Sequence, residues 1–471
     1  MSERSWKLHR LTRCSAIVAG VLLAAPSPAQ DAQYWNIQYG PAAQLLGGLV
    51  VGSSRDLSAT YYNPGGLALG TSADFLLSAQ AFKAESLSTR PVDGGQILNN
   101  SQTQFDVFPG FFAFSFPKSW FGDNTHLAFS LLTRQQFNMR IDQRFAGDTS
   151  SGNGRYGIET LFDQRMSETW GGLTVSHQIS NHFGLGATVY GIYRGQRTRL
   201  EQSLQLAYPD GRGVAALAVD DFDYSHWRTL AKVGLAWEGE RLRLGGAITT
   251  PRVAVTGSGK LGFTRSATGV DLNGDGKTDN LLVNAYDEDL DAGYNSSWAF
   301  SAGASWRRGS LQLHTSAEYF APVEDFTILE GRTLDSAGQP LTLVQRLDGV
   351  FNLGGGAEYW LGGVTADKGA SSRGTVFYAA FITDFSASPE VVRNEAATSN
   401  MNLYHLSAGS AFNLGTSRFS LGLTWAFGQN TRDFGLDSLP PSVPIIGEAR
   451  PVETRYSRLV FVLGYLFGSD K

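Results

Sequence analysis

Apolar and polar residues alternate over long stretches of this chain, most clearly near its C-terminal end. Between Tyr456 and Phe467, one face of an extended strand is entirely apolar or aromatic, with Leu459, Phe461, Leu463, Tyr465 and Phe467. A period of two over about ten residues, ending on an aromatic residue, is what a tilted transmembrane β-strand requires. The pattern therefore predicts strands that cross an outer membrane within a closed barrel.

The same alternation recurs along the chain, interrupted by clusters of Gly, Asn, Asp and Ser that are typical of turns. It predicts fourteen strands, and an even number is expected of a bacterial single-chain barrel. The expected fold class is all-β, a 14-stranded antiparallel transmembrane β-barrel. The predicted strands are 73–84, 105–116, 126–138, 166–178, 183–199, 227–237, 241–255, 296–306, 310–321, 350–360, 374–385, 403–413, 417–427 and 456–467.

The connections between these strands alternate in length. Short connections are predicted at 117–125, 179–182, 238–240, 307–309, 361–373 and 414–416. The connections between them are longer: 85–104, 139–165, 200–226, 256–295, 322–349, 386–402 and 428–455. Outer-membrane barrels have short periplasmic turns and long external loops. Both termini are therefore expected in the periplasm, and loops 200–226 and 256–295 are expected to capture a ligand outside the cell.

The N-terminus has the features of a secretory signal peptide over residues 1–29. A basic region is followed by an apolar run at 16–25 and by Ser27-Pro28-Ala29, a small-residue cleavage site. No other part of the sequence has 18 consecutive apolar residues, so no membrane-spanning helix is predicted. The barrel is expected to occupy residues 73–467, and residues 468–471 form a short C-terminal tail.

Composition narrows the possible functions. The only cysteine, Cys14, lies in the predicted signal peptide, so the mature chain would have no disulfide, catalytic thiol or thiolate metal site. Cleavage would remove four of the 38 basic side chains and one of the 43 acidic side chains, leaving an acidic chain. That balance argues against a nucleic-acid partner. A soluble array of β-sandwiches is the alternative that composition alone leaves open.

The inner face of the predicted barrel has a mixed lining. The alternation places Arg194, Lys232 and Arg243 toward the lumen, and also the aromatic residues Phe320, Phe377 and Phe381. A general porin with a water-filled lumen would be more uniformly polar. The lining therefore favours an apolar or amphipathic ligand, with one of the cations available to pair with a carboxylate.

Residues 47–69, which include Asn63-Pro64-Gly65, resemble the N-terminal hatch of the FadL family of outer-membrane transporters for long-chain fatty acids and hydrophobic compounds. Stretches 107–117, 175–187 and 244–252 are similar to later parts of the family in the same order. The resemblance implies that residues 30–72 form an N-terminal extension and a hatch that plugs the lumen. It also implies passive uptake of a hydrophobic small molecule such as a long-chain fatty acid, opened by movement of the hatch around Asn63 and Pro64.

Three features depart from the family's pattern, and one of them is the N-terminus at residues 30–37, which is longer before the hatch than in the best-known members. Gly65 stands where the family usually has Ala, which gives the local backbone more freedom. The third strand, 126–138, lacks the Gly or Pro expected at the kink that opens a side portal in the family. The sequence leaves open whether a ligand leaves through the wall or along the lumen.

An acidic stretch at 271–279 has the spacing of a calcium-binding loop. Asp271, Asn273, Asp275, Lys277 and Asp279 occupy the ligand positions of its first nine residues, with Lys277 offering its backbone carbonyl. The twelfth position holds Leu instead of the usual Glu. The stretch is therefore either a weak extracellular calcium site or a solvated acidic loop, and no cofactor is required otherwise.

No enzyme is expected, because the histidines are scattered and no Gly-x-Ser-x-Gly motif is present. Two alternatives to hydrophobic uptake remain: a structural or interaction barrel without transport, and a porin for polar solutes. The expected partners are a hydrophobic ligand, outer-membrane lipid and the outer-membrane assembly machinery.

Overall fold

The computed structural model describes residues 33–70, 74–91, 98–104, 108–117, 120–148, 154–271, 275, 277–334, 340–361, 374–388, 401–414, 417–434 and 450–467. The predicted signal peptide (1–29) and C-terminal tail (468–471) lie outside these residues. None of the described helices is long and apolar enough to cross a membrane.

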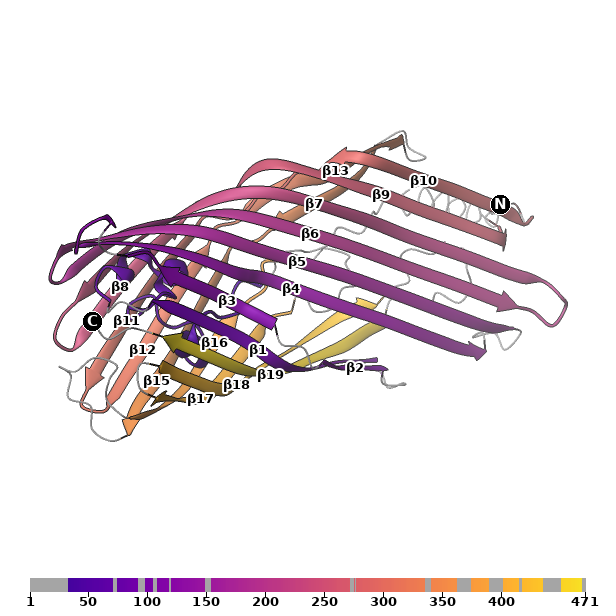
Figure 1. Cartoon of the computed structure of the whole chain (residues 1–471). Helices are drawn as coiled ribbons and strands as arrows, with labels where there is room; N and C mark the ends of the chain where they lie inside the picture. Colours follow the sequence, from indigo (N-terminus) through magenta and orange to yellow (C-terminus); the bar gives the residue numbers. More distant parts are fainter. Residues whose placement is uncertain are drawn as a thin grey trace, which may run out of the picture.

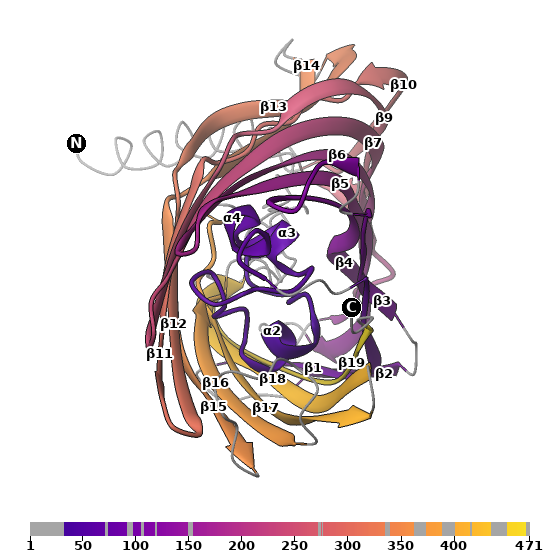
Figure 2. The same cartoon turned by 60° about the vertical axis from the view of Figure 1, so that its left-hand side comes forward.

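The chain forms a closed barrel of fourteen antiparallel strands, which confirms the predicted fold class (Figures 1 and 2). The ring closes where β1 pairs with β19, with Phe75 opposite Phe467. Three of the fourteen barrel strands are interrupted and appear as two segments each. The segments are β1 (Phe75–Pro91), β2 (Leu98–Gln104) with β3 (Phe108–Ser115), β4 (Thr125–Asp148), β5 (Arg155–Ser180), β6 (Phe183–Ala207), β7 (Gly213–Glu238), β8 (Leu242–Thr249) with β9 (Val253–Val270), β10 (Asp279–Asp291) with β11 (Ala299–Arg308), β12 (Leu311–Phe320), β15 (Val350–Leu361), β16 (Thr375–Asp384), β17 (Leu403–Leu414), β18 (Ser417–Phe434) and β19 (Arg450–Phe467).

Several strands are much longer than a membrane requires. Strands β4 to β7 have 24 to 26 residues each. Together with β9 and β10 they extend beyond the rest of the barrel and form what we call the extended wall, or long wall (Figure 1). The predicted external loops 200–226 and 256–295 are therefore wrong as loops: most of their residues continue β6, β7, β9 and β10 as paired strands. The predicted strands were cut to the thickness of a bilayer, but that thickness sets only the minimum length of a transmembrane strand.

The region between β12 and β15 also contains ordered structure. Strands β13 (Val323–Leu334) and β14 (Pro340–Leu347) form a separate two-stranded sheet. Apolar side chains of this hairpin, including Ile328 and Leu329, are buried against Phe222 and Tyr224 on the inner face of the extended wall. The hairpin therefore narrows the lumen on the side of the long strands.

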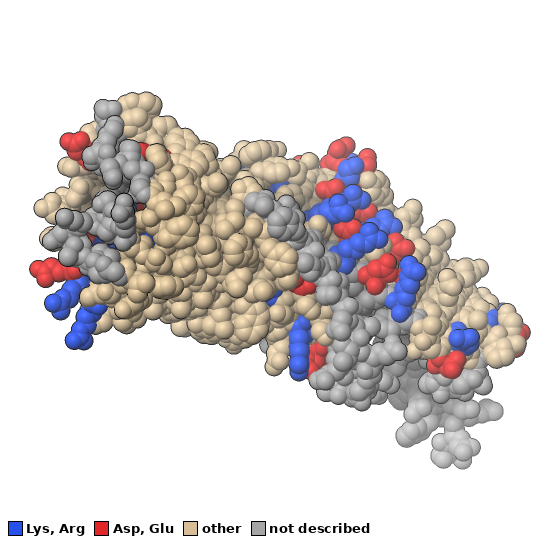
Figure 3. All heavy atoms as spheres, turned by 60° about the horizontal axis from the view of Figure 1, so that its bottom comes forward, with Lys and Arg blue, Asp and Glu red and all other residues tan. Residues whose placement is uncertain are grey.

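The outer surface has the layers of a membrane-spanning barrel. Two rows of exposed aromatic side chains bound an apolar belt, and in the face drawn in Figure 3 a broad band is nearly free of charge. We call the row nearer the extended strands the extension-side girdle, formed by Tyr193, Trp227, Phe300, Tyr319, Phe351 and Tyr404. The turn-side girdle, nearer the short connections, contains Phe183, Trp306, Tyr359, Phe377, Phe419 and Phe467.

The N-terminal segment lies inside the ring of strands (Figure 2). It contains three short helices, α2 (Pro41–Leu45), α3 (Ala59–Tyr62) and α4 (Pro64–Leu67). Their apolar side chains form one buried cluster with inward residues of the barrel wall, among them Leu76, Phe111, Val460 and Val462. Apolar residues on the inner face of the wall therefore pack against this plug, here called the hatch.

Candidate ligand site in the barrel lumen

Asn63 ties the hatch to the wall of the barrel. Its side chain caps α4 by accepting a hydrogen bond from the backbone N–H of Gly65 (3.2 Å). Its Nδ2 donates to the carbonyl oxygen of Val51 in the hatch (2.9 Å) and to that of Leu235 in β7 (3.0 Å). Asn63 is fully buried, so these backbone groups have no water to replace it.

Gly65 fits the hatch against two wall strands. A methyl group at this position would lie 2.5 Å from the carbonyl oxygen of Gly234 in β7 and 2.6 Å from that of Gly184 in β6. Gly65 is not among the glycines with positive φ. The expected reason for glycine here, greater backbone freedom, is therefore wrong, and close approach to the wall backbone requires it instead.

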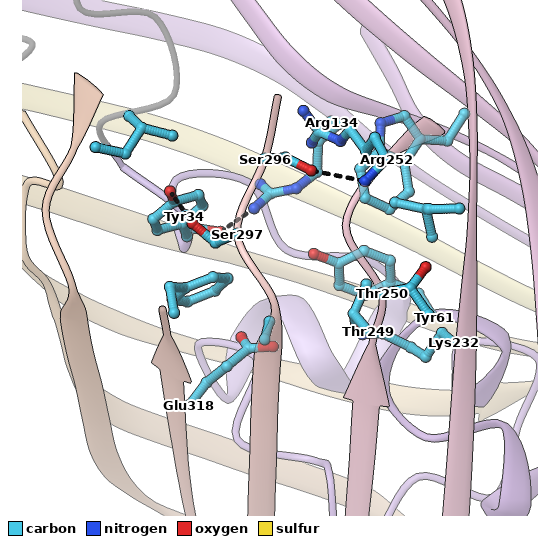
Figure 4. A pocket seen from close by; sticks show the side chains of 15 residues that line it. Tyr34, Tyr61, Arg134, Lys232, Thr249, Thr250, Arg252, Ser296, Ser297 and Glu318 are labelled. Carbon is cyan, nitrogen blue, oxygen red and sulfur yellow. Dashed lines mark hydrogen bonds between the residues drawn. The ribbon is translucent and has the colours of Figure 1, made fainter. Parts of the chain in front are cut away.

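A small cavity of ≈ 40 Å³ lies between the hatch and the long-strand wall (Figure 4). Its walls combine aromatic rings with cations. Tyr34 stacks on Phe320 at 3.8 Å between ring centroids, and Lys232 Nζ lies 4.6 Å from the ring centroid of Tyr61. The full lining is Tyr34, Tyr61, Arg134, Trp170, Leu230, Lys232, Thr249, Thr250, Arg252, Ser296, Ser297, Ala299, Glu318, Phe320 and Leu347.

Hydrogen bonds between the hatch and the strands on both sides of it hold the hatch end of this cavity. Arg134 Nη2 donates to the carbonyl oxygen of Tyr34 (2.7 Å), and Trp35 Nε1 donates to Glu318 Oε2 (2.7 Å). Burial raises the pKa of the Tyr61 phenol, which therefore stays neutral at physiological pH. The cavity thus has ordered polar groups at one end and aromatic surfaces around them.

A cluster of charges adjoins the cavity through Arg252. Its centre is Glu168, a fully buried carboxylate that contacts three guanidinium groups. The distances are 2.7 Å to Arg228 Nη2, 3.0 Å to Arg252 Nη2 and 3.2 Å to Arg194 Nη1. Trp170 Nε1 also donates to Glu168 at 2.6 Å.

Cations outnumber carboxylates around this part of the lumen. Glu168 and Glu318 face five cationic side chains: Arg134, Arg194, Arg228, Lys232 and Arg252. Water is largely excluded here, so charges interact more strongly than at a surface. The excess positive charge, next to aromatic walls, suits the anionic end of an otherwise apolar molecule.

The structure brings three of the predicted lumen residues to this site. Lys232 and Phe320 line the cavity, and Arg194 belongs to the adjoining Glu168 cluster. Arg243 also points inward but lies near the short-turn end of β8, where its Nη2 contacts Glu238 Oε1 at 2.6 Å. Glu238 Oε2 also accepts from Arg55 Nε of the hatch (2.9 Å), so Arg243 supports a hatch contact instead of the cavity.

The predicted lumen positions of Phe377 and Phe381 are wrong. Both side chains are exposed on the outer face of β16, by 48% and 43%, while Tyr378 and Ala380 point toward the hatch. The hatch makes the inner face of this strand as apolar as the lipid-facing side. Alternation then no longer indicates which face is inside.

Most of the cavity lining was not predicted from the sequence. Arg134 and Trp170 do lie on inward faces of their strands, so a systematic assignment of faces would have marked them. Arg252 follows Thr250-Pro251, where the strand breaks between β8 and β9. Tyr34 and Tyr61 lie in the hatch, which has no periodic pattern, and the sequence gives no comparable signal for them.

The acidic stretch 271–279 lies at the tip of the β9–β10 hairpin. The backbone N–H of Asp275 donates to Asp271 Oδ1 (3.1 Å), and that of Lys277 donates to Asp275 Oδ1 (2.8 Å). Asp279 begins β10, and Asn273 lies outside the described residues. The described part of the chain contains no group of three or more His, Cys, Asp or Glu residues arranged to hold a metal. Calcium binding by this stretch stays a prediction.

Comparisons with known proteins support the fold. A model of the FG-GAP repeat matches residues 263–299, from within β9 to the first residue of β11. No curated protein sequence matches the chain. Among solved structures, a FadL homologue of Pseudomonas aeruginosa is 13% identical, with 93% of this chain and all of that chain covered and a TM-score of 0.59.

Two toluene transporters are similar in the same way. TodX of Pseudomonas putida is 12% identical, with 92% of this chain and 99% of that chain covered and a TM-score of 0.56. TbuX of Ralstonia pickettii is 12% identical, with 91% and 98% covered and a TM-score of 0.50. The resemblance inferred from the hatch sequence is confirmed at the level of the fold: this chain has the FadL-family fold.

Proposed function

We propose that this protein is an outer-membrane channel for the passive uptake of hydrophobic small molecules, with carboxylates such as long-chain fatty acids among its ligands. The observation that carries the proposal is the lumen site, where aromatic walls meet an excess of cations directly beside a hatch. The similar structures include a FadL homologue and toluene transporters, which agrees with a hydrophobic ligand.

Both parts of such a ligand would find a matching surface. Its apolar part would lie against the rings of Tyr34, Trp170 and Phe320, and burial of an alkyl chain contributes ~0.8 kcal/mol per methylene. Its carboxylate would pair with Lys232 or Arg252. The hatch side of the cavity would have to move, because ≈ 40 Å³ is far smaller than the ~300–1,000 Å³ of ordinary ligand pockets.

We place the short-turn end in the periplasm, since such barrels keep their short turns on that side. The extended strands and the β13–β14 hairpin would then lie on the extracellular side of the membrane. A ligand would enter from that side, reach the cavity and pass when the hatch moves around Asn63 and Pro64. The apolar belt requires outer-membrane lipid, and insertion would require the assembly machinery.

Uptake by proteoliposomes tests this function. A series of fatty acids, toluene and a sugar would be offered to vesicles with and without the barrel. We expect fatty-acid uptake that increases with chain length and no sugar flux, because the lumen offers little to hydrate a polar solute. Sugar flux without a fatty-acid effect would identify a polar-solute porin, and no flux of any solute would identify a structural barrel.

A charge variant tests the site itself. Lys232→Met removes a buried cation of the cavity while keeping a similar length, and we expect about a tenfold loss of fatty-acid uptake with unchanged toluene uptake. Arg212→Gln is the matched control, because Arg212 is exposed at the β6–β7 turn, where its side chain contacts Asp210 and the ring of Tyr208, both far from the cavity. Equal effects on fatty acid and toluene would argue against carboxylate recognition by Lys232.

A further inference from the structure

The outer face of the extended wall carries a band of charged side chains next to the apolar belt. Figure 3 shows Lys, Arg, Asp and Glu gathered there, beyond the broad band that is nearly free of charge. The charged residues belong to β4, β5, β6, β7, β9 and β10, and none of them takes part in the lumen site. Their arrangement is set by the register of the strands.

The register places two arginines directly opposite each other in this band. On β6, Tyr193 of the extension-side girdle faces Trp227 of β7. Four residues further along β6, Arg197 faces Arg165 of β5. Both arginines point outward, since the residues before and after Arg197 in β6 are buried inside the barrel. Like charges directly opposite each other destabilise a pair of strands.

The other basic residues of the band have acidic partners. Arg199 Nη2 lies 2.9 Å from Glu201, Arg144 Nη2 lies 2.8 Å from Glu159, and Lys260 Nζ lies 3.1 Å from Glu288. Arg165 reaches one carboxylate, Asp163 Oδ1, at 3.4 Å.

Arg197 differs from these residues. It forms no ion pair with another described residue, although Asp223 is its cross-strand neighbour on β7. The opposed pair therefore combines Arg165, which has one carboxylate partner at 3.4 Å, with Arg197, whose guanidinium forms no ion pair with a described residue.

The position of the pair matches that of lipid headgroups. Four residues of a strand span ~13 Å, or ~10 Å along the axis of a barrel whose strands tilt by about 40°. The guanidinium groups thus begin just beyond the girdle, and long arginine side chains can reach back toward the headgroup layer. Two adjacent guanidinium groups offer parallel N–H donors that match a phosphate.

We propose that Arg165 and Arg197 together bind a phosphate group of a phosphorylated lipid in the leaflet around the extended wall. The bound phosphate neutralises the opposed arginines and fixes this side of the barrel in the membrane. The proposal rests on the membrane placement of the barrel and not on transport, so loss of uptake and loss of lipid binding are separate results.

Lipid retention tests the proposal directly. The full barrel would be placed in nanodiscs containing bis-phosphorylated lipid A or the same lipid with its phosphates removed, and bound lipid would be counted by native mass spectrometry after transfer to detergent. We expect about tenfold preferential retention of the phosphorylated form. An Arg165→Gln, Arg197→Gln double variant should lose the preference, whereas the control Arg155→Gln, Arg212→Gln, with two exposed arginines further from the belt, should keep it.

Equal retention of the two lipids by the wild type, or an unchanged preference in the double variant, would overturn the proposal. Folding of each variant is checked by heat-modifiable migration. In a further measurement, inorganic phosphate is added at the same concentration as the lipid and the unfolding temperature is compared. If it raised the unfolding temperature as much as the phosphorylated lipid does, the site would recognise free phosphate and not a membrane lipid.

A neutral substitution separates binding from a purely structural role. Arg197→Gln removes the charge opposite Arg165 without adding a carboxylate opposite Asp223, so in phosphate-free detergent it should leave the unfolding temperature unchanged or raise it. The same variant should lose the extra stabilisation that phosphorylated lipid gives the wild type. Stabilisation of the variant by that lipid as large as that of the wild type would contradict the proposed site.

Discussion

The two sides of this barrel differ in the length of their strands and in the side chains on their inward faces. On the side of β12, β15, β16 and β17, the strands have 10 to 12 residues, and both apolar and polar inward side chains contact the hatch, among them Tyr378, His314 and Asp384. On the side of β4 to β7, the strands have 24 to 26 residues, and their inward faces carry the buried charges of the lumen site. Both walls contact the hatch, and the long wall supplies four of the five cations beside the cavity.

This difference explains why the two walls tolerate different inward residues. Against the short wall, the hatch itself supplies partners for inward polar groups: Asp384 Oδ1 accepts from the backbone N–H of Trp35 (2.9 Å), and Ser53 Oγ lies 2.9 Å from His314 Nδ1. The long wall buries Glu168 only because three arginines and Trp170 surround it. Substitutions on each side should therefore fail for different reasons.

The largest effect is expected from Glu168 on the long wall. Glu168→Gln removes the charge that compensates Arg194, Arg228 and Arg252, and breaking a buried ion pair in this way costs about 3–5 kcal/mol. Urea unfolding in lipid vesicles measures the loss. Glu159→Gln, on the same strand but in an exposed pair with Arg144, should cost less than about 1 kcal/mol. Similar losses in the two variants would show that the buried cluster is not held by its charges.

The next effect tests which face of the short wall is outside. Phe381→Arg should reduce the unfolding free energy by about 2–4 kcal/mol, because an arginine would face lipid in the apolar belt. Folding yield and urea stability in vesicles give the measurement. If the variant lost no stability, the side chain of Phe381 would have to face the lumen instead of lipid.

A smaller effect is expected where the hatch meets the long wall. Gly65→Ala places a methyl group 2.5 Å from the carbonyl oxygen of Gly234, and such overpacking costs about 1–3 kcal/mol. The hatch should shift, so uptake of toluene and fatty acid should change more than barrel assembly. Gly191→Ala is the control, because its added methyl group would meet its nearest described neighbour, the carbonyl oxygen of Gly171, at 3.9 Å. Wild-type uptake by Gly65→Ala would contradict a closely packed hatch.

The smallest effect concerns the tip of the extended wall. Calcium should protect the 271–279 stretch from protease only at high concentration, since a loop without the twelfth-position Glu would bind weakly. An Asp271→Ala, Asp275→Ala double variant should lose the protection. Protection that is the same with magnesium, or unchanged in the variant, would leave only a solvated acidic loop.

The sequence alone was sufficient for the architecture of the barrel. Lipid imposes alternation on every strand, and closure imposes antiparallel neighbours, so fourteen strands and their short turns could be recognised one by one. The hatch motif at Asn63 and Pro64 was also readable, because its residue types are unusual in sequence.

Tertiary structure decided the rest, since contacts distant in sequence determine it. The lengths of β4 to β7 depend on pairing that continues beyond the membrane, where no hydrophobic belt marks a limit. The inner face of β16 became clear only with the hatch in place, because packing against protein and packing against lipid select the same apolar residues. The lumen site joins Tyr34 and Tyr61 of the hatch to Arg134, Lys232 and Arg252 of the wall, and only closure of the barrel around its plug brings these side chains together.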